Sequence, residues 1–180
     1  MSMRSEQLAI LESHIRDIPD FPKPGIIFKD ITPLLSNTAA FKTAIDMLAE
    51  RLSDSDIDFI ACPEARGFIW AAPLAYRLGA GITLIRKPGK LPADTIDHTF
   101  ELEYGSDTLS IHADAFASQP NPNVLIVDDV LATGGTAKAT AELITAAGGK
   151  VAGVAVLIEL DFLDGRSRLA GLPVTSLLNY

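Results

Sequence analysis

The chain has 180 residues, of which 48% are hydrophobic and 21% are charged, and it carries a formal net charge of −8. These proportions are close to those of globular proteins and exclude a disordered or fibrous class, and the length predicts one domain spanning residues 1–180. The negative charge argues against a nonspecific nucleic-acid-binding protein, which would need a basic stripe on its surface.

The first part of the chain predicts two amphipathic helices with an irregular segment between them. Residues 18–33 contain four prolines and a glycine, so they should wander over the surface as a lid while Phe21 and residues 26–28 stay pinned to the body. The apolar positions at helical spacing are Leu8, Leu11, Ile15 and Ile18 in the first helix and Phe41, Ile45, Leu48 and Leu52 in the second.

From residue 57 onward, strand patterns and helix patterns alternate. This alternation implies parallel strands joined by helices, and hence an α/β fold with a parallel central sheet flanked by helices. An antiparallel hairpin interrupts it, with strands at 97–104 and 108–112 and a turn at 105–107. The other strands are predicted at 57–62, 82–86, 124–127, 151–158 and 174–178, the helices at 68–78, 137–147 and 165–170, and an exposed loop at 87–95.

Residues 124–137 carry the most informative motif, which places a glycine-rich turn between a buried strand and a helix. Gly134 and Gly135 allow the backbone to approach a bulky anion, and Thr133 and Thr136 supply hydroxyl donors. Because such a turn directs several N–H groups and the positive end of the helix dipole toward one point, it predicts a phosphate site.

Asp128 and Asp129 lie at the carboxyl end of the same strand, where open α/β sheets bind their ligands. Carboxylates suit ribose hydroxyls rather than phosphate, and Mg²⁺ could share the same sugar or its pyrophosphate. The acidic pair or the glycine pair alone would be an ordinary turn, and the chain contains neither GxxxxGK[ST] nor GxGxxG. In combination they resemble the phosphoribosyl pyrophosphate (PRPP) signature of type I phosphoribosyltransferases.

A second strand-to-helix loop, residues 62–67, contains Glu64 and Arg66. Arg66 and the N–H groups at the helix start could bind an anion, and Gly67 permits close approach of the backbone. A salt-bridged loop would be the simpler interpretation if the first loop were absent. Two anion-binding loops at one sheet edge predict a doubly phosphorylated ligand, and PRPP fits.

Arg86, Lys87 and Lys90 form the one obvious cationic cluster, in a loop that also contains glycine and prolines. A solvated charged loop is the common fate of such a sequence. We favour a closing lid, whose cations neutralise the departing pyrophosphate and which excludes water from the reaction.

The single cysteine, Cys62, excludes an intrachain disulfide and is compatible with a reducing compartment. No signal peptide pattern opens the sequence, and no apolar window reaches the roughly 18 residues that cross a bilayer, so we expect a cytoplasmic protein without membrane contact. Cys62 is expected to be a buried structural thiol. The three histidines lack metal-site spacing, so no zinc site is expected.

Five segments, in order along the chain, resemble the adenine phosphoribosyltransferase family. They are residues 20–31, 64–68, 86–92, 102–105 and 124–137, which read DFPKPGIIFKDI, EARGF, RKPGKLP, LEYG and VLIVDDVLATGGTA. The resemblance covers nearly the whole chain. It implies the type I phosphoribosyltransferase fold, with about residues 1–35 as an N-terminal helix and base-binding hood and with a flexible hairpin loop.

The resemblance also implies an activity: Mg²⁺-dependent transfer of phosphoribose from PRPP to N9 of adenine, giving AMP and pyrophosphate in purine salvage, by a homodimer. Glu103 would handle the proton at purine N7, Arg66 would act beside it in catalysis, and Tyr104 would close over the reacting groups. Ile27 and Lys29 would contact adenine from the hood, where the family often has Arg in place of Lys29. Three groups of residues would hold PRPP. Asp128 and Asp129 would bind the ribose, and the 5′-phosphate would be bound by Ala132, Thr133, Gly134, Gly135 and Thr136. The pyrophosphate would be bound by Glu64, Ala65, Arg66, Arg86, Lys87 and Lys90, and Mg²⁺ would be held mainly by PRPP, with Asp128 and Asp129 as its candidate protein ligands.

Two other functions stay open from the sequence. A noncatalytic PRPP-binding regulator would normally need a DNA-binding extension or a basic face, and the sequence has no evident region of this kind. A phosphoribosyltransferase for another purine, such as a 6-oxopurine, would keep the fold and mechanism. The hood and the 102–105 segment favour adenine, on the resemblance alone.

Overall fold

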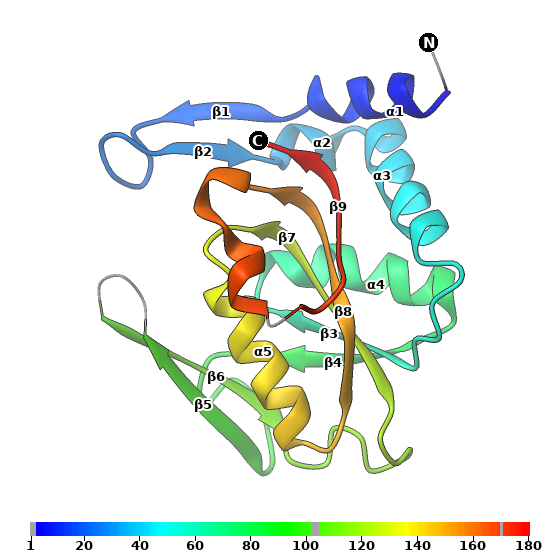
Figure 1. The fold of residues 1–180 in the computed structure, drawn as a ribbon, viewed down its shortest axis with the longest axis vertical. Coiled ribbons are helices and arrows are strands. Elements are labelled where there is room, and N and C mark those ends of the chain that lie inside the picture. The colour runs from blue at the N-terminus through cyan, green and yellow to red at the C-terminus, as the bar shows by residue number, and fades with distance from the viewer. Residues whose placement is uncertain (1–2, 102–104, 170) are drawn as a thin grey trace.

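The computed structural model describes residues 3–101, 105–169 and 171–180. Its centre is a sheet of five strands in the order β4-β3-β7-β8-β9, with every neighbouring pair parallel (Figure 1). The inner strands are rich in aliphatic residues because both of their faces are covered. The strands are β3 (Phe59–Pro63), β4 (Gly81–Ile85), β7 (Asn123–Leu131), β8 (Lys150–Glu159) and β9 (Val174–Asn179). The predicted α/β class with a parallel sheet is confirmed.

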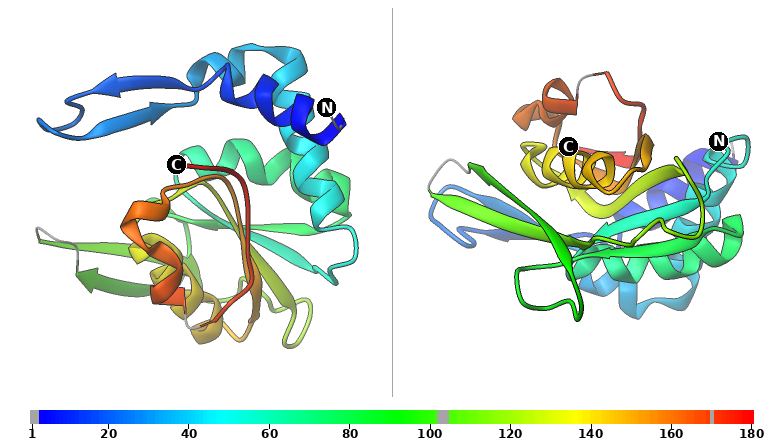
Figure 2. Two further views of the ribbon diagram at one scale, coloured as in Figure 1. Left: turned by 45° about the horizontal axis from the view of Figure 1, so that its top comes forward. Right: turned by 90° about the horizontal axis from the view of Figure 1, so that it is seen from below.

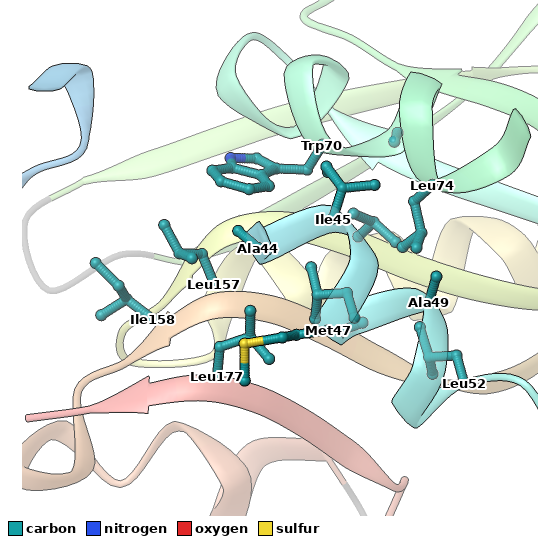
Figure 3. Packing of buried hydrophobic residues seen from close by; sticks show 14 of the residues in the cluster. Ala44, Ile45, Met47, Ala49, Leu52, Trp70, Leu74, Leu157, Ile158 and Leu177 are labelled. Carbon is teal, nitrogen blue, oxygen red and sulfur yellow. The ribbon is translucent and has the colours of Figure 1, made fainter. Parts of the chain in front are cut away.

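Helices cover both faces of the sheet. On one face α3 (Thr38–Arg51) and α4 (Arg66–Leu78) pack against β7, β8 and β9, and Figure 3 shows Trp70 and Leu74 of α4 beside Ile45 of α3 in this core. On the other face lie α5 (Gly135–Ala146) and the hairpin of β5 (Thr95–Glu101) and β6 (Ser106–His112). None of the described helices is long and apolar enough to cross a membrane.

The order of the strands reverses between β3 and β7. The chain crosses through α4 from β3 to β4 on one side, and then returns to the other side of β3 to form β7. Such a switch point opens a crevice at the carboxyl ends of the two strands, where α/β proteins bind ligands. Because β3 and β7 are paired from Phe59↔Val124 to Ala61↔Ile126, the loops that follow them begin side by side.

The prediction of an irregular segment at residues 18–33 is wrong. The first helix, α1 (Met3–Glu12), ends early, and the chain then forms an antiparallel hairpin of β1 (Arg16–Pro19) and β2 (Ile27–Asp30), followed by the short α2 (Thr32–Ser36). Prolines are tolerated because Pro19 ends its strand and the others lie in the connecting loop or in the first turn of α2. Ile15 and Ile18 therefore lie outside the helix predicted for them.

The expectation that the apolar residues of this hairpin are pinned to the body is also wrong for three of the four, whereas Phe28 is half-buried. Phe21, Ile26 and Ile27 are 51%, 44% and 55% exposed. Figures 1 and 2 show the reason: the β1–β2 hairpin projects past the sheet, as does the β5–β6 hairpin on the opposite side of the crevice. The two hairpins flank the carboxyl edge of β3 and β7.

Smaller differences concern element boundaries. β7 continues through the two aspartates to Leu131, because its partner β8 extends equally far. The turn predicted at 105–107 is wrong for two of its residues, since Ser106 and Asp107 already pair with Glu101 and Phe100 of β5, and residues 102–104 of the predicted strand 97–104 lie outside the described residues. The short helix predicted at 165–170 is a 3-10 helix, η2 (Gly165–Leu169), preceded by another, η1 (Asp161–Leu163), and Ala170 lies outside the described residues.

Candidate active site

The loop between β7 and α5 forms a small pocket at the sheet edge. Gly134 caps the helix in a left-handed conformation, with φ of 81°, and no side chain caps the first N–H groups of α5. These N–H groups are therefore free to meet an anion. The pocket is lined by residues from β3, β7, β8, the loop and the first turn of α5, namely Pro63, Ile126, Asp128, Val130, Leu131, Ala132, Thr133, Gly134, Gly135, Thr136, Ala137, Val154 and Val156.

The two aspartates point to different partners. Asp128 lines the pocket, and its Oδ1 accepts a hydrogen bond of 2.8 Å from the backbone N–H of Asp129. Burial and the neighbouring Asp129 carboxylate raise the pKa of Asp128 well above its usual range. Asp129 is only 4% exposed, and its Oδ2 lies 2.6 Å from Nε of Arg66.

Arg66 joins the two strand-to-helix loops. It is the first residue of α4, and its ion pair with Asp129 links the loop after β3 to the end of β7. The adjacent Gly67 favours this approach, since a Cβ there would lie 3.0 Å from the carbonyl oxygen of Val127, which is tighter than an ordinary contact. The predicted convergence of the two loops is confirmed geometrically, and the guanidinium, with 49% of its side chain exposed, can still reach a ligand.

The cationic loop is organised by Glu64. Nε of Arg86 lies 2.7 Å from the Glu64 carboxylate, which also accepts the N–H of Lys87 at 3.2 Å. Burial works to raise the pKa of Glu64, but these hydrogen bonds outweigh it and hold the pKa below its usual value. The Arg86 guanidinium donates to the carbonyl of Lys90 at 3.2 Å, and Lys87 pairs with Asp107 of β6. The Glu64 carboxylate thus orients Arg86 rather than facing an anion itself.

In the hood, defined here as the β1–β2 hairpin, Phe28 is the residue that turns toward the site. Its ring centre lies 5.3 Å from the Arg66 guanidinium carbon and 5.2 Å from the Phe21 ring. Lys29 instead points toward Asp17, at 2.8 Å, and stands 3.8 Å above the ring of Tyr180. The sequence predicted Ile27 and Lys29 as contacts for adenine and did not single out Phe28. Strand alternation places Phe28 on the face of β2 opposite to both of these residues.

Two residues predicted for the site are not placed, and Cys62 lies in the core. Glu103 and Tyr104 fall outside the described residues, beyond the end of β5 at Glu101. Cys62 is fully buried, and burial, with a smaller contribution from Asp128, raises its pKa to about 12, as suits a structural thiol. Among residues 3–101, 105–169 and 171–180, no group of three or more His, Cys, Asp and Glu residues is placed to hold a metal ion.

A second residue that the sequence did not single out is Gly165. A Cβ on Gly165 would lie 2.2 Å from the carbonyl oxygen of Ala132, and a Cβ on Gly134 would lie 2.4 Å from the carbonyl oxygen of Gly165. Real Cβ atoms do not come this close to a carbonyl oxygen, so the loop after β7 and η2 can pack together only when both positions are glycine. The sequence signal was Gly165 itself, in an isolated position between polar residues.

Comparisons with known proteins agree with this arrangement. Residues 31–170 match the family model "Phosphoribosyl transferase domain". The chain is 55% identical over 175 residues to an adenine phosphoribosyltransferase of Thermobifida fusca, covering 97% of this chain and 98% of that protein. The solved adenine phosphoribosyltransferase of Thermoanaerobacter pseudethanolicus superposes with a TM-score of 0.92 at 53% identity, covering 96% and 99% of the two chains. That of Saccharomyces cerevisiae, at 39% identity and 97% and 99% coverage, superposes with a TM-score of 0.89.

Proposed function

The chain belongs to the adenine phosphoribosyltransferase family, and from this premise we propose how its own residues transfer phosphoribose from PRPP to N9 of adenine, giving AMP and pyrophosphate in purine salvage. The observation that carries the proposal is the Arg66–Asp129 pair at 2.6 Å, which joins two anion-competent loops at the switch point of the sheet. The solved relative from Saccharomyces cerevisiae was complexed with an iminoaltritol 1,6-bisphosphate and adenine, a doubly phosphorylated ligand together with a base.

The phosphoribosyl group would lie in the pocket after β7. Its 5′-phosphate would accept hydrogen bonds from the free N–H groups at the start of α5 and from the hydroxyls of Thr133 and Thr136, with Ala132, Gly134 and Gly135 completing the loop. The ribose hydroxyls would donate to Asp128 and Asp129. A bound hydroxyl relieves Asp128, since it solvates a carboxylate that is otherwise buried beside another acid.

The pyrophosphate would lie against the loop after β3. Arg66, the N–H groups of Ala65 and Arg66 and the cations Arg86, Lys87 and Lys90 would surround that position, with Glu64 orienting Arg86 and its own N–H already donating to Ile85. Opening of the Lys87–Asp107 pair would free one further cation for the leaving group. These groups stabilise charge that develops on the pyrophosphate as it departs.

Adenine would lie between the hood and the sheet edge. Phe28 offers an aromatic face beside Arg66, and Ile27 offers backbone groups on β2. Lys29 would act indirectly, because its contacts with Asp17 and Tyr180 fasten the hood to the C-terminal end of the chain.

In the reaction the C1–oxygen bond to pyrophosphate breaks, the C1–N9 bond to adenine forms, and adenine loses one proton. The sugar passes through an oxocarbenium-like state, so the protein has to position the reactants and stabilise the leaving group rather than create a nucleophile. Glu103, with Tyr104 closing the site, would handle the purine proton at N7. Mg²⁺ fits this donor set: Asp128 in the pocket and Asp129 beside Arg66 are carboxylates, which are hard oxygen ligands, and the ion would offset pyrophosphate charge.

We also propose a homodimer that acts in the cytoplasm. The outer side of α4 and the edge strand β4 expose a group of large apolar side chains. Ile85 points to the α5 face, so by strand alternation Ile82 and Leu84 point to the α4 face, where they remain 43% and 40% exposed. With Ile69 and Tyr76 of α4, they form an apolar surface suited to a second copy.

The experiment that tests the function is product formation by the purified chain with PRPP, Mg²⁺ and one base at a time: adenine, hypoxanthine, guanine or xanthine. We expect AMP and pyrophosphate with adenine alone. Product with another base would overturn the base assignment, and binding of PRPP without any product would favour a noncatalytic regulator.

A further inference from the structure

The segment that follows β8 folds back onto the pocket loop. The backbone N–H of Leu160 donates to the carbonyl of Leu131 at 3.0 Å, and Gly165 at the start of η2 meets the loop backbone at Ala132 and Gly134. When two backbone segments pack this closely, neither can move without displacing the other, so the position of one segment constrains the position of the other. The conformation of the pocket loop is thus fixed in part by residues 159–166, which are distant from it in sequence.

A buried carboxylate holds this segment in place. Glu159, at the end of β8, is 4% exposed, and both of its oxygens accept hydrogen bonds from Arg166, at 2.5 Å from Nε and 2.6 Å from Nη2. Ser176 donates to the same carboxylate at 2.9 Å and Asn179 at 3.4 Å. The hydrogen bonds from Arg166 lower the pKa of Glu159 although burial raises it, so the carboxylate is held ionised.

Arg166 is the residue directly after Gly165. Its guanidinium also donates to the carbonyl of Val174 at 3.3 Å, so it ties η2 to both β8 and β9. A bidentate pair of this kind sets distance and angle together, which one point charge would not do. The pair thus presses Gly165 against Ala132 and Gly134 while neither charged group lines the pocket.

We infer that Glu159 and Arg166 are positioning residues for the 5′-phosphate of PRPP, which act by holding Gly165 against the pocket loop. The inference rests on the proposed function, in which residues 132–136 bind that phosphate. It adds that the pocket loop depends on its contact with Gly165 to keep its N–H groups directed toward the phosphate. Loosening of the clamp lowers the affinity for PRPP and leaves the adenine side of the site unchanged.

The test compares Arg166→Gln with Arg166→Lys and the control Arg77→Gln. Gln at position 166 keeps an amide donor for the buried Glu159 carboxylate, and Arg77 is a similarly half-exposed arginine whose carboxylate partner, Asp46, lies on α3. We expect Arg166→Gln to raise the KM for PRPP roughly tenfold, the equivalent of one hydrogen bond to a charged group. The KM for adenine and kcat stay within about twofold, and Arg166→Lys falls between.

A second measurement does not depend on turnover. Amide hydrogen exchange of residues 133–136 without ligand should become faster in Arg166→Gln, and in Glu159→Gln where that variant folds, but not in Arg77→Gln. Unchanged exchange together with an unchanged KM for PRPP would overturn the inference. So would equal rises in the KM values for PRPP and adenine, since these would indicate a general loss of structure.

Thr136→Val separates this inference from the proposed function. A rise in the KM for PRPP in Thr136→Val without any rise in Arg166→Gln would leave the phosphate site standing and reject the clamp. No change in Thr136→Val would reject the phosphate assignment of the loop, and the clamp with it.

Discussion

Nζ of Lys29 in the hood lies 3.8 Å from the centre of the Tyr180 ring, so the last residue of the chain holds a hairpin formed near its beginning. Tyr180→Ala should therefore raise the KM for adenine by roughly threefold to fivefold, as expected from a loss of about 1 kcal/mol of cation–π and packing contact. Tyr180→Phe keeps the ring and is the matched control. Steady-state kinetics with each substrate varied would check this, and a larger rise in the KM for PRPP would contradict it.

The same geometry predicts that Lys29→Arg has little effect. A guanidinium can also pair with Asp17, 2.8 Å from the Lys29 ammonium, and stack on Tyr180. Adenine affinity should stay within about twofold, because cation–π contacts tolerate either group. Lys29→Met, which removes the charge, should resemble Tyr180→Ala. If Lys29→Arg instead tightened adenine binding tenfold, that result would indicate direct stacking of this side chain on the base.

Replacement of Arg66 tests the link between the two loops. Arg66→Lys should lower kcat/KM by roughly tenfold or more, because Lys cannot pair with Asp129 and face the pyrophosphate in the same planar geometry. Arg77→Lys is a matched control on the same helix, since the side chains of Arg66 and Arg77 are 49% and 44% exposed and each pairs with an aspartate. Equal activity in the two variants would remove Arg66 from the catalytic machinery.

Asp128→Asn should stabilise the ligand-free protein while it weakens PRPP binding. The folded chain raises the pKa of Asp128 above 3.8, so its contribution to stability is greatest at low pH and is lost as pH rises through the raised pKa. Asn removes the buried charge beside Asp129, and the midpoint of thermal unfolding at pH 7 should rise. The variant's stability should also depend less on pH between the usual and the raised pKa. A lower midpoint at pH 7 would contradict the strain assigned to this carboxylate.

A comparison of Gly134→Ala with Gly148→Ala separates the cost of a positive φ from the cost of a steric clash. Both glycines have positive φ, 81° and 88°, so each substitution costs about 1 kcal/mol of stability from backbone strain. Of these two, Gly134 is the one where a Cβ would meet backbone, at 2.4 Å from the carbonyl oxygen of Gly165, whereas no atom of the described residues lies within 4 Å of a Cβ at Gly148. Isothermal titration should show loss of PRPP binding in Gly134→Ala alone. Equal binding by both variants would show that the loop can relax.

Ile82→Glu should disrupt the proposed homodimer. Light scattering of the parent chain should give twice the mass of 19.2 kDa, and the variant should give a single chain. Ile10→Glu is the control, because Ile10 and Ile82 are both 43% exposed and Ile10 lies on α1, away from the α4–β4 surface. A dimeric Ile82→Glu variant would move the interface elsewhere.

The sheet and its two strand-to-helix loops could be predicted from the sequence because their signals are local. A run such as residues 124–127 is apolar at every position, and the adjacent glycines that follow it are typical of a turn that approaches an anion. The hood was missed because its prolines suggested irregular chain. The prolines lie at the end of a strand and in a loop, where they are tolerated. Which of these positions a proline occupies depends on how the two strands pair, and that pairing, which joins Arg16 to Asp30, is not visible in the sequence.

The contacts within the site could not be predicted, since they depend on which strands become neighbours. Asp129 and Arg66 are 63 positions apart and meet only because β3 and β7 pair at the switch point. The clamp between Glu159 and Arg166 is closer in sequence, but it depends on a 3-10 turn that has no distinctive periodicity. The chemistry of each site side chain could be assigned from the sequence, whereas the residues that it contacts depend on the fold.

The hood stands apart from the sheet that carries the phosphoribosyl chemistry. Near the site it is joined to the rest of the chain through Phe28 beside Arg66 and Lys29 beside Tyr180, while the remainder of the hairpin projects past the sheet edge (Figure 2). Under the proposed function, base recognition by the hood and sugar transfer at the sheet edge would be separable modules of one chain. Exchange of residues 16–30 for another hairpin that keeps these two anchors offers protein engineering a route to a new base without rebuilding the sheet.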